Sequence, residues 1–257
     1  LPIVIVGAGG IVREAHLPAS KIAGFEVSGI YDTNKEKSVD LASAFGIPHV
    51  YESLEDLIDN SPRDAVFDLA LPASAIIPVL LKIPEGRAVL MQKPMGNNFR
   101  EALDILKISR QRKLTAGVNF QLRYAPFINE ARSIIQQGLI GEVCDIDVNI
   151  NVHTPWVRWE FLSTLERVEI LYHSIHYVDL IRSFYGNPSG VLARTFRHPN
   201  SPGFAAVKSS IIMDYGDVKR AVINANHNHD FSPRHQYAHI KIEGTNGAIL
   251  INLGLLL

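Results

Sequence analysis

Apolar residues follow different patterns in the two halves of the chain. Up to about residue 120, short apolar runs alternate with segments whose apolar residues recur at helical spacing. This alternation of strand and helix predicts a parallel sheet with helices on both faces. The predicted strands cover residues 3–6, 25–31, 65–69, 88–91 and 114–118. Three predicted helices begin at Arg13 and at the capping boxes Thr33-x-x-Glu36 and Ser53-x-x-Asp56, and a fourth covers 99–112.

Strands dominate the second half. A helix over 126–137 leads to a strand over 143–152, in which apolar and polar residues alternate as they do in a half-buried strand. A helix over about 170–185 precedes several runs separated by turn sequences, which predict a mainly antiparallel sheet. These runs cover 189–196, 205–214, 218–226, 236–243 and 248–252. The sequence thus predicts an α/β protein with a doubly wound domain over 1–121 and an α+β domain over 122–257.

The first strand leads directly into a glycine turn. Gly7, Gly9 and Val12 have the spacing of a dinucleotide-binding fingerprint, although position 12 is usually glycine or alanine. Glycine at position 7 permits the tight turn, and glycine at position 9 lets the backbone approach a pyrophosphate. The residues expected to bind the phosphates through this turn are Gly7, Gly9, Gly10, Ile11 and Val12. The pattern predicts a Rossmann domain, with an ordinary α/β turn as the alternative.

An acidic residue follows the second predicted strand. Asp32 lies 20 residues after Val12, where a carboxylate would bind the ribose hydroxyls of NAD. The same carboxylate would repel the 2′-phosphate of NADP, so we predict NAD as the cofactor. Lys35 and Lys37 are close enough in sequence to weaken that discrimination, and NADP stays possible.

Further candidates follow the later strands, because ligands of open α/β sheets bind beyond the carboxyl ends of the strands. Leu71 and Pro72 lie where a loop could border the nicotinamide, and Gln92 and Asn119 directly follow two other strands. Lys93 could hydrogen-bond a substrate hydroxyl and stabilise the alkoxide that forms as hydride leaves. The alternative is a surface lysine before a proline that ends the strand.

Residues 169–179 form the second candidate site. If this segment is helical throughout, Glu169, His173 and His176 share one face, flanked by Tyr172 and Asp179. A histidine there could accept a proton from a hydroxyl, since its pKa lies near neutrality. Two alternatives stay open: ligation of a divalent metal, and histidines packed in the core.

Two other segments could contact substrate. Residues 153–160 hold His153, Trp156, Arg158, Trp159 and Glu160, and indole rings suit the apolar faces of sugars. A packed subunit contact is the alternative there. The histidine-rich segment from His227 through His229 and Asp230 to His235 and His239 indicates a pocket wall or an oligomer face more than a metal site.

Composition narrows the possible partners. The 257 residues are 47% hydrophobic and carry a net charge of −1, which gives no general attraction to nucleic acid or anionic lipid. Cys144 is the only cysteine, so no internal disulfide can form, and a reducing, cytoplasmic location is expected. The apolar N-terminus lacks a basic segment and a cleavage site and is interpreted as a strand, and no apolar run is long enough to span a membrane.

Several motifs together resemble the glucose–fructose oxidoreductase / inositol dehydrogenase / rhizopine-catabolism (Gfo/Idh/MocA) family. They are the Gly7 turn, Asp32, Lys93-Pro94, the segment from Asn119 to Tyr124, and His176-Tyr-Val-Asp179 followed by Gly186-Asn-Pro. The resemblance covers essentially the whole chain. It implies a Rossmann domain, a C-terminal domain whose open sheet supports homodimers or homotetramers, and NAD(P)-dependent chemistry on a sugar, a polyol or a related hydroxyl.

The resemblance also implies roles for single residues. The family's Glu-Lys-Pro lysine matches Lys93 and its Asp-x-x-x-His histidine matches His176. Two positions depart from the pattern: Gln92 replaces the glutamate, and Tyr172 replaces the aspartate. Glu169, His173 or Asp179 could supply the missing partner of His176, or Tyr172 could bind substrate directly.

The sequence therefore predicts an NAD(P)-dependent oxidoreductase that acts on a secondary hydroxyl. The expected catalytic residues are Lys93, His176, Tyr172 and His173, and the expected substrate contacts are His153, Trp156, Arg158, Glu169, Asp179 and Tyr124. The expected partner is a small sugar-like or polyol-like molecule, with no metal. An NAD-dependent glycosidase and a cofactor-sensing regulator without catalysis are the alternatives.

Overall fold

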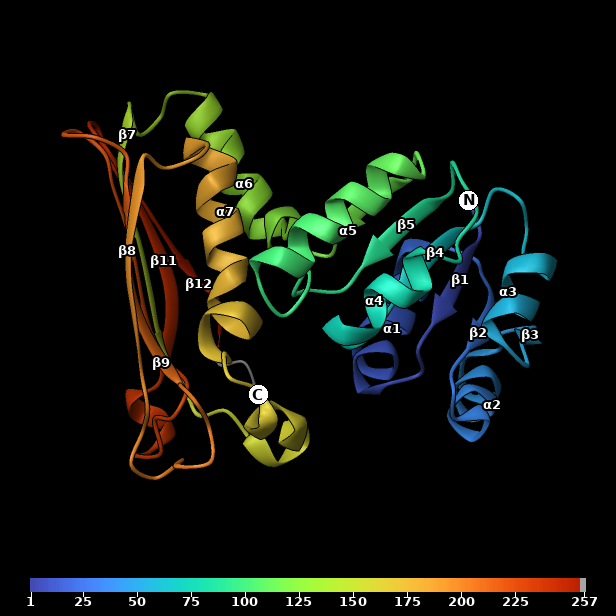
Figure 1. Cartoon of the computed structure of the whole chain (residues 1–257). Coiled ribbons are helices and arrows are strands. Elements are labelled where there is room, and N and C mark those ends of the chain that lie inside the picture. The colour runs from blue at the N-terminus through green and yellow to red at the C-terminus, as the bar shows by residue number, and fades with distance from the viewer. Residues whose placement is uncertain (255–257) are drawn as a thin grey trace. The chain divides into compact units, whose positions relative to one another are not determined.

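The chain folds into two compact units, Leu1–Asn119 and Phe120–Leu257, so the division lies just before the boundary expected from the sequence. The structure, a computed structural model, describes residues 1–254 apart from the side chains of Trp159 and Glu160. Each unit is built on a six-stranded sheet (Figure 1). The α/β class predicted from the sequence is confirmed.

The sheet of the first unit is parallel throughout, with the strand order β3-β2-β1-β4-β5-β6. Its strands are β1 (Ile3–Val6), β2 (Val27–Tyr31), β3 (His49–Val50), β4 (Val66–Leu69), β5 (Ala88–Met91) and β6 (Thr115–Val118). This is the order of a doubly wound dinucleotide-binding sheet, in which the strand order reverses between β1 and β4. In sheets of this kind ligands bind beyond the carboxyl ends of the strands at this point.

Helices cover both faces of this sheet. They are the π-helical turn Val12–His16 and the helices α1 (Leu17–Ala23), α2 (Lys35–Phe45), α3 (Leu54–Asn60), α4 (Ala73–Leu80) and α5 (Phe99–Gln111). Alternate residues of β1 pack into different clusters: Val4 and Val6 pack with Phe67, whereas Ile5 packs with Val12 and Ile30. Because successive strand residues face opposite sides, both faces of the sheet are buried.

The helix caps correct one detail of the sequence interpretation. Ser53 caps α3 as expected, since its hydroxyl accepts a hydrogen bond from the Asp56 amide at 3.0 Å. The residue that caps α2 is Asn34 rather than Thr33, and its side chain accepts from the Glu36 amide at 3.1 Å. Asparagine is at least as good a cap as threonine, so the helix begins one residue later than expected.

The sheet of the second unit has the order β12-β11-β7-β10-β9-β8. Its strands are β7 (Val143–Asn151), β8 (Gly190–Phe196), β9 (Lys208–Asp214), β10 (Arg220–Asn226), β11 (Tyr237–Gly244) and β12 (Ala248–Asn252). Neighbouring strands are antiparallel except for β7 and β10, which run parallel. The predicted, mainly antiparallel sheet is confirmed.

One face of this second sheet is covered by helices (Figure 1). The helical segments are the 3-10 helix Gln121–Tyr124, α6 (Pro126–Gln136), the 3-10 helix Trp156–Thr164, the π-helical turn Ile170–Ser174, α7 (Ile175–Tyr185) and the 3-10 turn Pro233–His235. Leu180 and Ile181 of α7 pack with Val148 and Ile223 of the sheet in one buried cluster. Every second residue of each strand points away from these helices. Ile212 of β9 is one of these residues and is 48% exposed.

None of the helices within the described residues combines the length and the apolar character that crossing a membrane requires.

Candidate functional site

The glycine turn after β1 has a conformation that its sequence requires. Gly7 has a φ of +108°, and a Cβ at this residue would lie 2.4 Å from the carbonyl oxygen of Ala70, which follows β4. Any other residue would clash with backbone there. Added Cβ atoms on Gly9 and Gly10 would meet nothing within 4 Å, so this part of the turn presents open backbone. The turn can therefore receive a pyrophosphate at the start of the helical segment that follows it.

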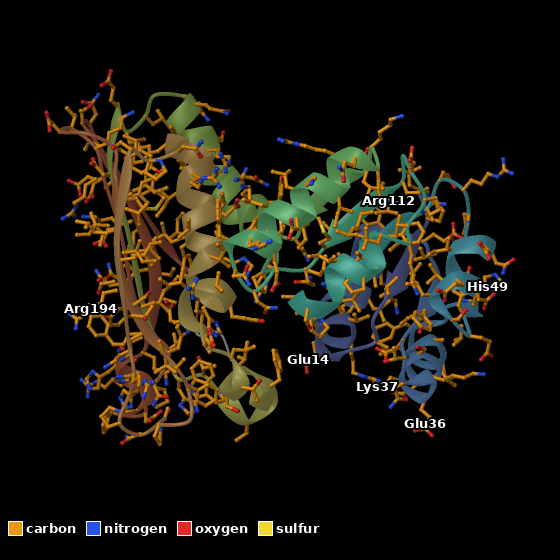
Figure 2. All side chains as sticks on the ribbon, viewed as in Figure 1. Glu14, Glu36, Lys37, His49, Arg112 and Arg194 are labelled. Atoms are coloured by element: carbon orange, nitrogen blue, oxygen red, sulfur yellow. The ribbon has the colours of Figure 1, made fainter. Side chains whose placement is uncertain are left out.

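Asp32 at the end of β2 is held by the same turn. Its Oδ2 accepts a hydrogen bond from the Ala8 amide at 2.7 Å, and its Oδ1 accepts from the Asn34 amide at 2.8 Å. These bonds fix the carboxylate at the carboxyl edge of the sheet. Lys35 forms a surface ion pair with Glu52 at 2.5 Å, and Lys37 points outward from α2 (Figure 2). The residues present thus fit the adenosine end of NAD.

Lys93 follows β5 at the same edge. It is half-buried, and burial lowers the pKa of its amine from 10.5 to about 8. Desolvation disfavours the charged form of a lysine, which places the amine close to the range in which proton transfer is useful. The lysine is thus neither a freely solvated nor a permanently charged group.

Sequence reasoning missed His16 and Asp68. His16 Nδ1 lies 2.6 Å from Asp68 Oδ2, and His16 Nε2 lies 2.6 Å from Gln92 Nε2 and 3.5 Å from Asn119 Nδ2. Gln92 and Asn119, expected to bind the cofactor, thus direct their side chains to a histidine. The signal was present in β4, where Asp68 is a single charged residue in an apolar run and is buried.

In the second unit, Glu169 lies at the start of a π-helical turn, which corrects the expectation of a regular helix through this segment. A π-helical turn is wider and brings residue i+5 alongside residue i. Accordingly, Ser174 donates a hydrogen bond to Glu169 Oε1 at 2.6 Å, and His227 Nε2 lies 3.4 Å from the same oxygen. Glu169 is 0% exposed, so its carboxylate faces the interior of the second unit.

His173 lies in a group of aromatic rings. Its imidazole stacks on that of His227, with ring centroids 4.3 Å apart, and meets the Trp156 ring edge-on at 5.7 Å. Trp156 also packs on Phe204, and its Nε1 donates to Asn228 Oδ1 at 3.0 Å. The structure thus brings together three segments that the sequence analysis selected separately: Trp156, His173 and His227.

His176 lies on α7, one turn further on. Its ring meets the Phe120 ring edge-on at 6.0 Å. Asp179, three residues later, accepts two hydrogen bonds from the guanidinium of Arg123, at 2.6 and 2.7 Å. Asp179 is buried in this ion pair, which joins α7 to the 3-10 helix Gln121–Tyr124.

The remaining candidates of the second unit are His153, Arg158, Tyr124 and Tyr172. His153 Nδ1 lies 3.0 Å from Asp230 Oδ1, and Asn228 donates to the other Asp230 oxygen at 2.9 Å. Arg158 and Tyr124 are exposed, whereas Tyr172 meets the Phe161 ring edge-on at 6.2 Å. The side chains of Trp159 and Glu160 lie outside the described residues.

A metal site is the alternative function of Glu169, His173 and His176, and of His227 and His229. Within the described part of the chain, three or more His, Cys, Asp or Glu side chains do not gather into a set that could hold a metal ion.

Comparison with known proteins supports this description. Residues 1–120 match the family described as an oxidoreductase family with an NAD-binding Rossmann fold, and residues 128–250 match the GFO/IDH/MocA C-terminal domain. The chain belongs to the Gfo/Idh/MocA oxidoreductase family. The resemblance inferred from its motifs is confirmed, and its first unit is an NAD-binding Rossmann domain.

Members of this family with named activities align with nearly the whole chain. The 1,5-anhydro-D-fructose reductase of Ensifer adhaerens is 26% identical over 254 residues, which cover 96% of this chain and 74% of the reductase. A solved oxidoreductase from Agrobacterium radiobacter, in complex with NAD+, L-tartaric acid and magnesium, has a TM-score of 0.83 at 20% identity, covering 97% and 73% of the two chains. The scyllo-inositol dehydrogenase of Lactobacillus casei, solved with NAD(H) and scyllo-inositol, has a TM-score of 0.79 at 21% identity, covering 98% and 76%.

Proposed function

We propose that this Gfo/Idh/MocA oxidoreductase transfers a hydride between the nicotinamide of NAD and a secondary hydroxyl of a sugar, a polyol or a related small molecule. The observation that carries this proposal is the half-buried Lys93 at the carboxyl edge of an NAD-binding sheet, with its pKa lowered to about 8. The names of the reductase and of the scyllo-inositol dehydrogenase support the substrate class.

The chain's own groups have separate tasks in this scheme. The Gly7–Gly10 turn and Asp32 would hold the phosphates and the ribose, and bound NAD would supply the hydride acceptor. The ammonium of Lys93 hydrogen-bonds the reacting oxygen and stabilises negative charge on it, which is a preorganised electrostatic contribution. His176 accepts the proton of the substrate hydroxyl as general base.

The rings around His173 indicate where a sugar would bind in the second unit. Trp156 offers an apolar face, and His153, paired with Asp230, offers a hydrogen-bonding group that is about half exposed. Aromatic faces and polar tips of this kind suit the mixed surface of a sugar or polyol. We assign substrate contacts to His153, Trp156 and Arg158, with Tyr172 and His173 beside the base.

A panel of polyols and sugars, each incubated with the purified chain and NAD, tests the proposal by the absorbance of NADH. We expect NADH to form with at least one secondary alcohol, and its reverse reaction to consume NADH with the matching ketone. Release of a glycoside's leaving group without net NADH would identify a glycosidase instead. NADH binding without turnover in either direction, over the whole panel, would indicate a regulator.

Lys93→Ala tests whether the lysine acts in turnover and not in cofactor binding. Loss of one preorganised charged donor lowers turnover by about 10²–10³-fold. NADH affinity should stay unchanged, because backbone groups hold the phosphates. Lys82→Ala is the matched control, since Lys82 belongs to the same unit and its side chain is 53% exposed in a surface ion pair with Glu55. Near-normal activity of Lys93→Ala would remove the lysine from the mechanism.

A further inference from the structure

His16 connects four elements of the Rossmann domain at the edge where Lys93 lies. It belongs to the π-helical turn that follows the glycine turn, and its side chain is only 9% exposed. One ring nitrogen contacts Asp68 of β4, and the other contacts Gln92 after β5 and approaches Asn119 after β6. The imidazole therefore cross-links the carboxyl ends of three parallel strands.

The two short contacts determine which nitrogen of His16 carries the proton. A carboxylate only accepts hydrogen bonds, so Nδ1–H donates to Asp68 Oδ2 at 2.6 Å. With the Gln92 amide nitrogen turned toward the ring, Nε2 accepts its hydrogen bond, also at 2.6 Å. In this arrangement Nδ1 is the donor and Nε2 the acceptor, and a buried carboxylate orients the ring.

Gln92 is the residue directly before Lys93. Its backbone amide donates to the Leu69 carbonyl at 3.1 Å, and its side chain is held by His16, so both ends of the residue are fixed. The backbone of Lys93 starts from this anchored residue. A displacement of about 1 Å at a reacting group can lower the rate about 10²-fold, so such an anchor matters for catalysis.

We propose that His16, oriented by Asp68, is a positioning residue for Lys93 and acts through the side chain of Gln92. The catalytic part of this inference rests on the proposed function, whereas its structural part concerns the Rossmann domain alone.

The inference also accounts for Gln92, where the family pattern has glutamate. A glutamate at this position could only accept a hydrogen bond, so it would need a second proton on His16. The imidazole would then be charged and would lie between two carboxylates. Glutamine supplies the N–H that a neutral, Asp68-oriented histidine can accept.

Three variants test this connection. His16→Ala removes both contacts. His16→Asn keeps a donor that can reach Asp68 but removes the acceptor for Gln92. Gln92→Ala removes only the contact between Gln92 and His16 and keeps the contact between His16 and Asp68. His49→Ala is the control, because His49 is an exposed histidine of the same unit (Figure 2).

Two of the three measurements need no substrate. In ¹⁵N-histidine-labelled protein, we expect the nitrogen shifts of His16 to show a proton on Nδ1 and none on Nε2. An additional variant used only in this measurement, Gln92→Glu, should place a proton on both nitrogens. In ¹³C-lysine-labelled protein, we expect Lys93 to titrate near 8 in the wild type. The three variants should raise that value toward 10.5, because a loosened turn admits water to the amine, and His49→Ala should leave it unchanged.

The third measurement is turnover. We expect kcat to fall about 10²-fold in all three variants while NADH affinity is kept. An imidazole protonated at Nε2, or a Lys93 titration unmoved by both His16→Ala and Gln92→Ala, would overturn the inference. If His16→Ala fails to fold, Gln92→Ala and His16→Asn decide. If the substrate panel shows no turnover, the proposed function fails while the two spectroscopic results still decide the role of His16.

Discussion

At the scale of single residues, burial gives Lys93 its chemistry. An exposed lysine is protonated throughout the physiological range, because its pKa is about 10.4. Desolvation lowers the pKa of Lys93 to about 8, so its charge becomes sensitive to small changes of environment. The neutral Gln92 beside it adds no negative charge that would favour the ammonium.

This pKa predicts how Lys93 affects stability. Between pH 8 and 10.5 the unfolded chain keeps a proton on this lysine that the folded chain has lost. Stability rises with pH wherever the unfolded state binds more protons. We therefore expect the free energy of unfolding of the wild type, relative to Lys93→Met, to increase over this window. Denaturant titrations of both proteins at several pH values measure it, and parallel profiles would contradict the lowered pKa.

Asp32 predicts the preference between cofactors. Its carboxylate is fixed by the Ala8 and Asn34 amides, and it would face the ribose of NAD and repel the 2′-phosphate of NADP. We expect calorimetric titration to give tighter binding of NAD than of NADP, and Asp32→Ser to reduce the difference. Lys37→Ala serves as control for the nearby positive charge. Equal or tighter binding of NADP by the wild type would refute this prediction.

At the scale of elements, one ion pair joins two helical segments of the second unit. Arg123 belongs to the 3-10 helix Gln121–Tyr124, and Asp179 belongs to α7. The hydrogen bonds to the Asp179 carboxylate raise the pKa of the Arg123 guanidinium, because they favour its charged form. Phe120, at the start of the same segment, contacts His176. The pair thus fixes the helix that carries the proposed base.

Breaking this pair should destabilise the second unit. Hydrogen bonds to charged groups contribute about 1.5–3 kcal/mol each, so we expect Arg123→Met to lower the free energy of unfolding by about 2–3 kcal/mol. Arg220→Met removes a similar two-bond contact to Asp145, but there the arginine is 60% exposed, and we expect a loss below about 1 kcal/mol. Equal losses in both variants, measured by urea unfolding, would argue against a role for burial.

At the scale of the whole molecule, the uncovered face of the second sheet is the candidate for assembly. Leu192 of β8 and Ile212 of β9 are paired in register and are 72% and 48% exposed. Exposed apolar patches are typical of surfaces that bind another protein. We propose that this face forms the homodimer or homotetramer contact expected from the sequence.

If copies of the chain assemble through this face, a substitution in it should change the oligomeric state. Ile212→Glu would place a charge in the proposed interface, so we expect sedimentation to shift from a dimer or tetramer to a smaller species. Val39→Glu, at an apolar residue of α2 that is 47% exposed, should leave the assembly unchanged. A wild-type protein that sediments as a monomer would refute the proposal.

The elements and the dinucleotide site were predictable because their signals are local. Strand runs such as Ala88–Met91, the glycine turn and Asp32 are each read within a few residues, and the topology of a doubly wound sheet then brings strand ends to one edge. The same local reading failed at Glu169, because a π-helical turn changes the spacing on which helical faces are assigned.

Only the tertiary structure determined which distant side chains meet. His16 contacts Asp68 and Gln92, which lie 52 and 76 residues further along the chain, and His173 stacks on His227. Periodicity shows which face of an element is buried, but it does not specify the neighbour across that face. Strand order and register set these contacts, so the sequence determined the two sheets, the glycine turn and the acidic residue of the NAD site, and the packing alone determined the partners of the buried histidines.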